Sequence, residues 1–194
     1  MTLKYEWADV VQKVLGWISF VAWSLSFYPQ SFDNYKSKSV AGFSLEFAML
    51  NPVGFYLYTV YNIQGAVDEK IGLTGTIYAN DLVFAVHAFM LSSVQLTQIF
   101  MYDRGKQDKV NPFIVGLLVF EFVTVTTIFI IEVINPNLID QNWATIRMCG
   151  YCKALITLVK YMPQVYLNWK RKSTVGWSLA NVLLDFTGGF FSFA

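Results

Sequence analysis

The sequence predicts an all-α membrane protein built from two parallel helix repeats. Hydrophobic residues make up 55% of the 194 positions and charged residues 14%, whereas a soluble domain carries about a quarter charged residues. Apolar runs of about twenty residues, the length that crosses a bilayer, recur along the chain. One motif occurs twice, around Pro29 and again 134 positions later around Pro163. A net charge of +1 gives no indication of nucleic acid as a partner.

Six apolar runs predict six membrane-spanning helices. They cover approximately residues 13–32, 43–63, 81–101, 112–133, 143–167 and 177–194. We expect a plan of three helices, a linker helix and three more, which resembles the parallel repeats of known transporters. The predicted parts are a short lumenal segment (1–12), a first repeat (13–102), a linker helix with its loops (103–142) and a second repeat that stops one helix short (143–194).

Basic residues alternate between the predicted loops. The first, third and fifth loops hold eight of them: Lys36, Lys38, Arg104, Lys106, Lys109, Lys170, Arg171 and Lys172. The second loop holds Lys70 alone, and the fourth holds none. Because basic loops stay on the cytosolic side, the three basic loops are predicted to be cytosolic and the N-terminus lumenal. Both copies of the motif then lie on the same side.

The repeated motif pairs a proline with a glutamine inside an apolar run. The pairs are Pro29-Gln30 and Pro163-Gln164. Proline removes a helical hydrogen bond and clashes with the preceding turn, and the freed carbonyl needs another partner in lipid. We expect each glutamine to act as a local donor and the paired bends to act as hinges. The alternative is two static kinks that only shape the bundle.

Charged and amide residues inside the last two runs predict a ligand cavity. Asp185 lies in the run NVLLDFTGG, where insertion of a carboxylate costs about 2.5–3.5 kcal/mol. Asn181 shares its helix face, Lys153 and Lys160 share another, and Asn51 is the repeat partner of Asp185. A lysine near Asp185 would offset part of the burial cost. Either the groups form a structural ion pair, or their spare donors bind a zwitterionic ligand.

The remaining polar residues give weaker signals. Asp81, at the start of the third run, is either a helix cap or a proton-relevant acid. Glu121 is predicted to be buried, without an assigned role. Cys149 and Cys152 are expected to be small packing residues rather than a metal or redox pair. No nucleotide loop, metal cluster or nucleophile pattern occurs in the sequence, so we predict neither an enzyme nor a cofactor or metal.

Four stretches resemble the cystinosins, the lysosomal cystine exporters of the PQ-loop family. They are FVAWSLSFYPQ, NDLVFAVHA, TLVKYMPQVYLNW and KSTVGWSLANVLLDFTGGF. The resemblance implies seven helices and proton-coupled export of L-cystine, by alternating access, from an acidic lysosomal or vacuolar lumen to the cytosol. Its implied partners are cystine, protons and the lipid bilayer. A seventh helix and a sorting tail do not occur in the sequence.

The resemblance also implies residue roles. Asp185 takes the coupling proton, and Asp81 is a second proton-relevant acid. The substrate residues, direct and nearby, are Lys160, Asn181, Asp185, Lys153, Asn51 and Asn168, and the cavity walls include Trp23, Phe27 and Tyr161. Two alternatives stay open: a related transporter of a sugar or another amino acid, and a receptor that binds a ligand without moving it. A sugar would not need Lys160 and Asp185, and a cationic substrate fits badly with two lysines.

Overall fold

The computed structural model describes residues 3–67, 79–107, 109–135, 137–140 and 143–192. Lys70, the basic residue of the second predicted loop, lies outside them. The described residues form helices and no β-sheet, with one isolated bridge between Ser39 and Asp103. The helices are α1 (Leu3–Ser37), α2 (Leu45–Val67), α3 (Ala79–Met101), α4 (Pro112–Ile134), α5 (Thr145–Val159), α6 (Tyr161–Arg171) and α7 (Leu179–Ser192). The predicted all-α class is therefore confirmed.

The prediction of one continuous fifth helix is wrong, because the helix is divided at Lys160. Helix α5 ends at Val159 and α6 begins at Tyr161. Pro163 has no N–H to donate to the carbonyl of Val159, four residues earlier, so the regular ladder is interrupted here. Helix α1 runs without a break through Pro29. The two prolines therefore do not have matching effects, and only the second one divides its helix.

Within the described residues, three helices are long and apolar enough to cross a bilayer by length and composition. They are residues Val10–Ser37 of α1, together with α3 and α4. The sequence predicted six such spans. The division at Lys160 leaves α5 and α6 individually short, and the described part of α7 has 14 residues. Helix α2 has the same length as α3 but carries buried Asn51 and Asn62.

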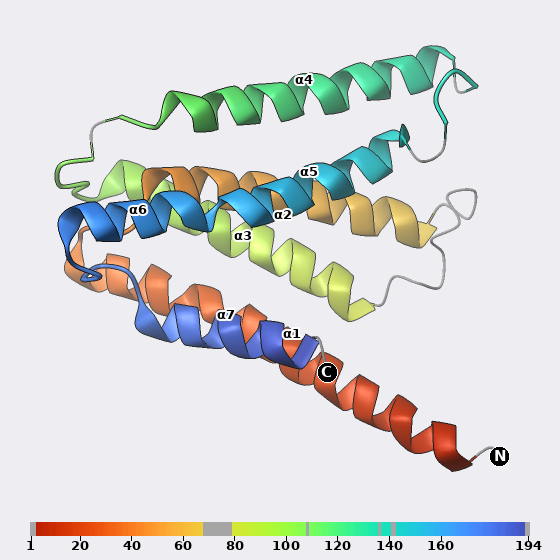
Figure 1. Ribbon diagram of the computed structural model, residues 1–194, viewed down its shortest axis with the longest axis horizontal. Coiled ribbons are helices and arrows are strands. Elements are labelled where there is room, and N and C mark those ends of the chain that lie inside the picture. Colours follow the sequence, from red (N-terminus) through yellow and green to blue (C-terminus); the bar gives the residue numbers. More distant parts are fainter. Residues whose placement is uncertain (1–2, 68–78, 108, 136, 141–142, 193–194) are drawn as a thin grey trace.

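The helices lie side by side in one bundle, with α4 at one edge and α1 with α7 at the other (Figure 1). Helix α3 packs against both α1 and α2, so the third helix of the first repeat lies between the other two. Helix α7 lies along α1, and α5 lies along α2. Helix α4 packs against α5 and, less extensively, α2, at the edge of the bundle. The two repeats therefore contact each other through α1 with α7 and α2 with α5.

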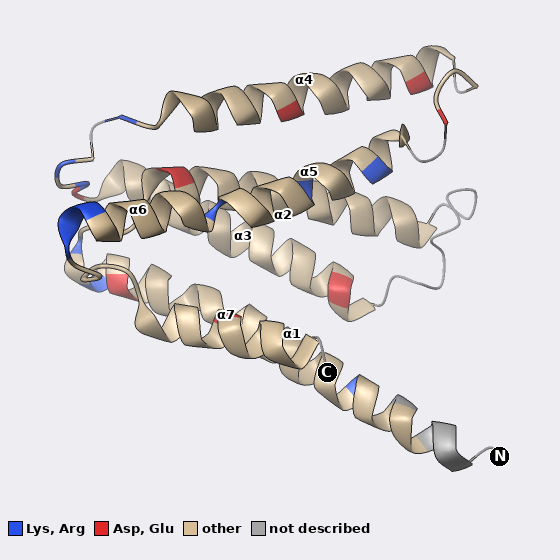
Figure 2. Ribbon diagram, in the orientation of Figure 1, with Lys and Arg blue, Asp and Glu red and all other residues tan. Residues whose placement is uncertain are grey.

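The two repeats turn at the same end of the bundle and in the same way. Lys38 follows α1 and Lys172 follows α6, and both have a left-handed φ of 52°. The chain then reverses into α2 and α7 (Figure 1). Most of the basic residues gather at this end, where α1, α3 and α6 finish (Figure 2). We call it the basic end.

The two reversing loops touch through glycines. A Cβ on Gly42 would lie 2.6 Å from the Cα of Gly176 and closer still to the carbonyl oxygen of Val175. Gly176 has a φ of +92°, which side chains rarely adopt. The close approach of the loops therefore requires glycine at both positions, which are equivalent in the two repeats.

Each motif glutamine binds the loop of the other repeat. The side-chain oxygen of Gln30 accepts a hydrogen bond from the backbone N–H of Ser178 at 2.8 Å, and its nitrogen donates to the carbonyl of Gly176 at 3.1 Å. The expectation that Gln30 acts as a local donor for a carbonyl freed by Pro29 is therefore wrong. Helix α1 directs this side chain toward the second repeat, where it pairs with two backbone groups of a loop.

Gln164 repeats this arrangement in the opposite direction. Its oxygen accepts from the N–H of Ser44 at 2.8 Å, and its nitrogen donates to the carbonyl of Gly42 at 2.9 Å. Both Gln30 and Gln164 are completely buried. The four cross-repeat hydrogen bonds, two from each glutamine, join the repeats at the basic end. We call these two arrangements the glutamine clamps.

Candidate functional site

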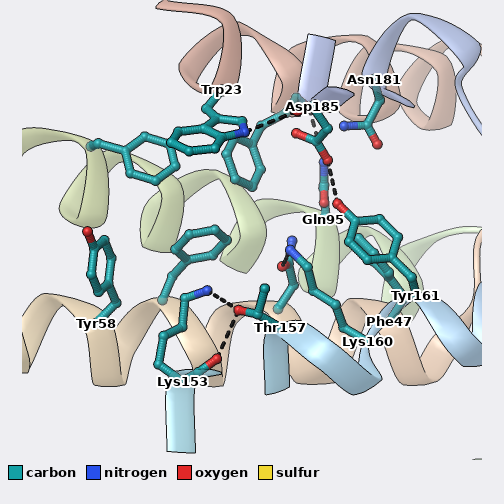
Figure 3. Close-up of a pocket in the computed structure, with 14 residues that line it drawn as sticks. Trp23, Phe47, Tyr58, Gln95, Lys153, Thr157, Lys160, Tyr161, Asn181 and Asp185 are labelled. Atoms are coloured by element: carbon teal, nitrogen blue, oxygen red, sulfur yellow. Dashed lines mark hydrogen bonds between the residues drawn. The ribbon is translucent and has the colours of Figure 1, made fainter. Parts of the chain in front are cut away.

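A cavity of about 310 Å³ lies between the two repeats (Figure 3). Side chains from α1, α2, α3, α5, α6 and α7, together with the residue that joins α5 and α6, enclose it. They are Trp23, Phe27, Phe47, Asn51, Phe55, Tyr58, Phe84, Gln95, Lys153, Thr157, Lys160, Tyr161, Asn181 and Asp185. The cavity combines two amines, one carboxyl and three amides with a mostly aromatic wall. Such a site suits a ligand that carries charges of both signs.

Lys160 is the residue at which α5 gives way to α6. It is buried, and its ammonium donates a hydrogen bond to the side-chain oxygen of Asn51 at 3.0 Å. The same ammonium lies 5.4 Å from the ring centre of Phe47 and 5.0 Å from that of Tyr161. Such cation–π contacts stabilise a desolvated ammonium. Lys160 is therefore held in the cavity by an amide and by aromatic faces.

Asp185 is held by the first and second repeats together. Its carboxylate accepts a hydrogen bond from the hydroxyl of Tyr161 at 2.6 Å, and its backbone carbonyl accepts from the indole N–H of Trp23 at 3.2 Å (Figure 3). Among the described residues it forms no ion pair with Lys160. The carboxyl and the amine thus share one cavity and hold separate partners, rather than forming a structural ion pair.

Lys153 supplies a second amine, two helical turns before Lys160. Seven residues correspond to about 10.5 Å along a helix axis. Its ammonium donates to the hydroxyl of Thr157 and lies 4.7 Å from the ring centre of Phe55. The ammonium of Lys160 lies 5.4 Å from the same ring. Phe55 is therefore an apolar surface within reach of both amines.

An aromatic cluster extends this surface. The ring of Phe55 meets those of Phe27 and Phe84 edge to face, with centre separations of 5.4 and 5.8 Å. The ring centres of Trp23 and Phe84 are 5.9 Å apart. Each ring comes from the first repeat, whereas both lysines come from the second. The cavity therefore has an aromatic wall on one repeat and charged groups on the other.

The structure brings most of the predicted site residues together. Eight of them line the cavity: Trp23, Phe27, Asn51, Lys153, Lys160, Tyr161, Asn181 and Asp185. Asn168 does not. Its side-chain oxygen accepts from the amide of Gln164 at 3.1 Å, because it lies one turn further along the face of α6 that carries the clamp.

Asp81 lies outside the set of residues that line the cavity, whereas Asn181 is buried and lines it. Asp81 is the third residue of α3, is half-buried, and interacts electrostatically with Tyr58 of the cavity wall. The amide of Asn181 donates to the carbonyl of Ser26 at 2.8 Å, which leaves its side-chain oxygen for the cavity. Their predicted roles in proton coupling and substrate binding stay predictions.

Sequence reasoning missed several lining residues. Gln95 could have been found from the sequence, because it is an amide inside an apolar run. The structure shows that it is buried. Its amide donates to the carbonyl of Phe27 at 3.0 Å. Phe47, Phe55 and Phe84 gave no signal, since phenylalanine in a membrane helix faces lipid or protein equally well. Only the packing of the helices shows which phenylalanines enclose the cavity.

The basic end of the cavity is closed. Phe47, which lines the cavity, belongs to an apolar cluster with Val40, Phe43 and Leu45 in the first reversing loop and at the start of α2. The glutamine clamps hold this loop against the second repeat. This apolar cluster and the clamps lie at the basic end of the cavity in this conformation.

The chain matches a family model and several known proteins. The model for the PQ loop repeat matches residues 11–70 and 145–194. Cystinosin of Bos taurus is 40% identical over 95% of this chain and 52% of its own length. The cystinosin homolog of Dictyostelium discoideum is 38% identical over 95% of this chain and 66% of its own. The cystine transporter of Saccharomyces cerevisiae is 29% identical over 91% of this chain and 74% of its own length. The chain thus spans about half to three quarters of these relatives.

Proposed function

Because this chain belongs to the PQ-loop family and, within it, to the cystinosins, we propose that it carries L-cystine, together with protons, out of an acidic lysosomal or vacuolar lumen. The observation that carries this proposal is the cavity between the repeats, where Lys153, Lys160 and Asp185 meet an aromatic wall. Transporters built from repeats bind substrates at such an interface. The name of the yeast relative, a cystine transporter, supports the same substrate.

The cavity suits the chemistry of cystine. This molecule has an amino acid group at each end, joined through a disulfide, and so carries two carboxylates and two ammonium groups. Lys153 and Lys160, about 10.5 Å apart along their helix, offer one amine to each carboxylate. Phe55, near both amines, offers an aromatic surface to the disulfide, since sulfur contacts with rings are favourable. A sugar would leave both amines without a counter-charge.

Asp185 is the proposed proton carrier. Cystine has no net charge near neutral pH, so a pH gradient acts on it only through a proton carried separately. Two pH units provide about 2.7 kcal/mol per proton, or roughly a hundredfold concentration ratio. Asp185 lines the cavity, and its carboxylate accepts a hydrogen bond from Tyr161 and forms no salt bridge with a lysine of the described part of the chain. We assign Asp81 as a second acid on the proton path.

The closed basic end supports alternating access as the proposed mode of transport. Basic loops are typical of the cytosolic side, so this conformation is closed toward the cytosol. Release requires the glutamine clamps to open and the two loops to separate. The interrupted backbone at Lys160 and Pro163 is the proposed hinge on the second repeat. Pro29, inside a continuous helix, would contribute less bending.

The test is flux of radiolabelled cystine through the full-length protein reconstituted in liposomes, with and without a pH step. We expect acid on the side opposite the basic end to accelerate transport toward the basic end. Asp185→Asn keeps a hydrogen-bond acceptor for Tyr161 but cannot carry the proton, so acid should no longer accelerate flux. The matched control is Asp33→Asn, which neutralises an exposed carboxyl near the end of α1.

Three outcomes would contradict the proposal. Acid-stimulated flux retained in Asp185→Asn would remove Asp185 as the proton carrier. Cystine binding without flux would indicate a receptor. Flux of another amino acid or a sugar, with no competition by cystine, would assign a different substrate.

A further inference from the structure

A second, larger cleft lies at the basic end, apart from the substrate cavity. Its volume is about 1230 Å³. The segment between α3 and α4 forms one side, the start of α4 another, and α6 the third. Helix α4 packs mainly on α5, so its first turns stand away from α6. No residue lines both the cleft and the substrate cavity.

The mouth of the cleft is strongly basic. Lys106, Lys109, Lys170 and Arg171 line it and are exposed (Figure 2). Among the described lining residues the one acid is Glu46. Asp108, between the two lysines of the α3–α4 segment, lies outside the described residues.

The carboxylate of Glu46 is already occupied. One oxygen accepts from the hydroxyl of Ser44 at 2.8 Å, and the other from the backbone N–H of Asn111 at 3.0 Å. Arg171 uses one N–H for the carbonyl of Val175, at 2.9 Å, and a guanidinium has five. The cleft therefore has more cationic donors than acidic acceptors and is complementary to an anion.

The part of the cleft beside the start of α6 is largely apolar. It includes Ile114 of α4 and Val159, Met162, Tyr166 and Leu167 around the start of α6. Met162 and Tyr166 are each 59% exposed, and the ring of Tyr166 lies beside that of Trp169 on the same helix. The basic mouth lies at the helix ends, where headgroups lie, and the apolar part lies along the helices, at the depth of the acyl chains. One occupant must satisfy both parts.

We propose that this cleft binds an anionic phospholipid of the leaflet at the basic end, with the phosphate at Lys106, Lys109, Lys170 and Arg171 and an acyl chain along α6. Basic pockets between membrane helices on the cytosolic side bind such headgroups. A free phosphate would match the cations and leave the apolar surface bare. A zwitterionic lipid would match the apolar surface and not the excess of cations.

The position of the lipid connects it to the moving part of the second repeat. Pro163 lines the cleft, and Lys170 and Arg171 precede the loop that reaches Gly176 and the clamp of Gln30. A lipid held there joins α4 to α6 on the side of the interrupted helix. Its binding therefore favours one position of α6, whatever ligand the substrate cavity carries.

The experiment measures binding of a water-soluble dioctanoyl phosphatidylglycerol to the full-length protein in detergent. The test variant is Lys106→Gln with Lys170→Gln, and the control is Lys36→Gln with Lys172→Gln. The control removes the same charge at the same end but outside the cleft. Because each basic residue near a membrane surface contributes about 1 kcal/mol, we expect the test variant to lose affinity about tenfold or more. The control should keep its affinity within about twofold.

Three competitors distinguish the occupants: dioctanoyl phosphatidylcholine, glycerol phosphate and a short polyglutamate peptide. We expect each to compete about tenfold less well than the anionic lipid. Equal competition by phosphatidylcholine would overturn the proposal, because the acyl chain alone would then suffice for binding. Equal competition by glycerol phosphate would also overturn it, because the charge alone would then suffice. Equal competition by the peptide would assign the cleft to an acidic protein partner. Equal losses in test and control variants, with unchanged helicity, would also overturn it.

Discussion

The side chain of Gln30 accepts a hydrogen bond from the backbone N–H of Ser178, 148 residues later in the chain, at 2.8 Å. The equivalent pair in the other direction, Gln164 and Ser44, has the same length of 2.8 Å. The motif glutamine therefore does not repair its own helix beside the proline. It fastens its repeat to the loop of the other repeat, and the two fastenings are reciprocal.

We predict that Gln30→Ala and Gln164→Ala each weaken the closed basic end. Gln164→Ala leaves the buried N–H of Ser44 and the buried carbonyl of Gly42 without this partner, and Gln30→Ala does the same to the buried N–H of Ser178. A buried group without a partner costs about 1–3 kcal/mol. The expected result is a lower thermal stability of the purified protein and faster labelling of a cysteine placed at Phe43. Gln64→Ala, at an exposed amide of α2, is the control. Equal labelling of all three variants would show that the clamps do not hold this end closed.

Gly42→Ala should separate the two reversing loops. The new Cβ would lie 2.6 Å from the Cα of Gly176 and against the carbonyl of Val175, both backbone atoms that cannot rotate away. Overpacking of this kind costs about 1–3 kcal/mol. Gly116→Ala in α4, where nothing lies within 4 Å of the new Cβ, is the matched control. Thermal unfolding of both variants tests the prediction, and a Gly42→Ala protein as stable as the control would contradict it.

Gly188→Ala should loosen α7 from α1. Its Cβ would lie 2.6 Å from the indole nitrogen of Trp23, the group that bonds the backbone of Asp185. The neighbouring Gly189→Ala meets nothing within 4 Å. We expect Gly188→Ala to reduce stability by about 1–3 kcal/mol and to reduce cystine binding, with Gly189→Ala unchanged in both. Tryptophan fluorescence with and without cystine is the measurement, and equal behaviour of the two variants would contradict the prediction.

Lys160→Met should reduce cystine affinity more than it affects folding. A hydrogen bond to a charged group contributes about 1.5–3 kcal/mol, so the loss should be roughly 10- to 100-fold in the dissociation constant. Binding of radiolabelled cystine checks this, with Lys36→Met, at an exposed position of α1, as the control. Loss of the variant from the membrane fraction would instead indicate that Lys160 acts mainly in folding.

Glu121→Leu should stabilise the protein. Glu121 is 2% exposed, and within the described part of the chain neither of its carboxyl oxygens has a hydrogen-bond partner. Burial of a polar group without partners costs about 1–3 kcal/mol, and leucine of similar volume removes that cost. The thermal midpoint should rise, and transport should not change. Lost transport in a well-folded Glu121→Leu protein would give this residue a function of its own.

The sequence alone determined the helical membrane class, the two parallel repeats and most of the polar residues that line the cavity. Hydropathy depends on composition over a window of residues, and charged groups such as Lys160 and Asp185 in apolar runs have few tolerable positions other than a cavity. The repeat then placed Asn51 opposite Asp185. These signals are local or periodic, so they can be read along the chain without knowing which helices meet.

Tertiary structure alone decided which partners these residues have. Lys160 and Asp185 were expected to lie near each other, and both line the cavity and interact electrostatically. Their hydrogen-bond partners differ, because Lys160 bonds Asn51 and Asp185 bonds Tyr161. Asn168 accepts a hydrogen bond from Gln164 of a clamp, and the ring of Phe55 lies near both lysines, a contact that nothing in the sequence pattern indicates. The direction in which a side chain points depends on the rotation of its helix against its neighbours, and that rotation is set by packing across the whole bundle.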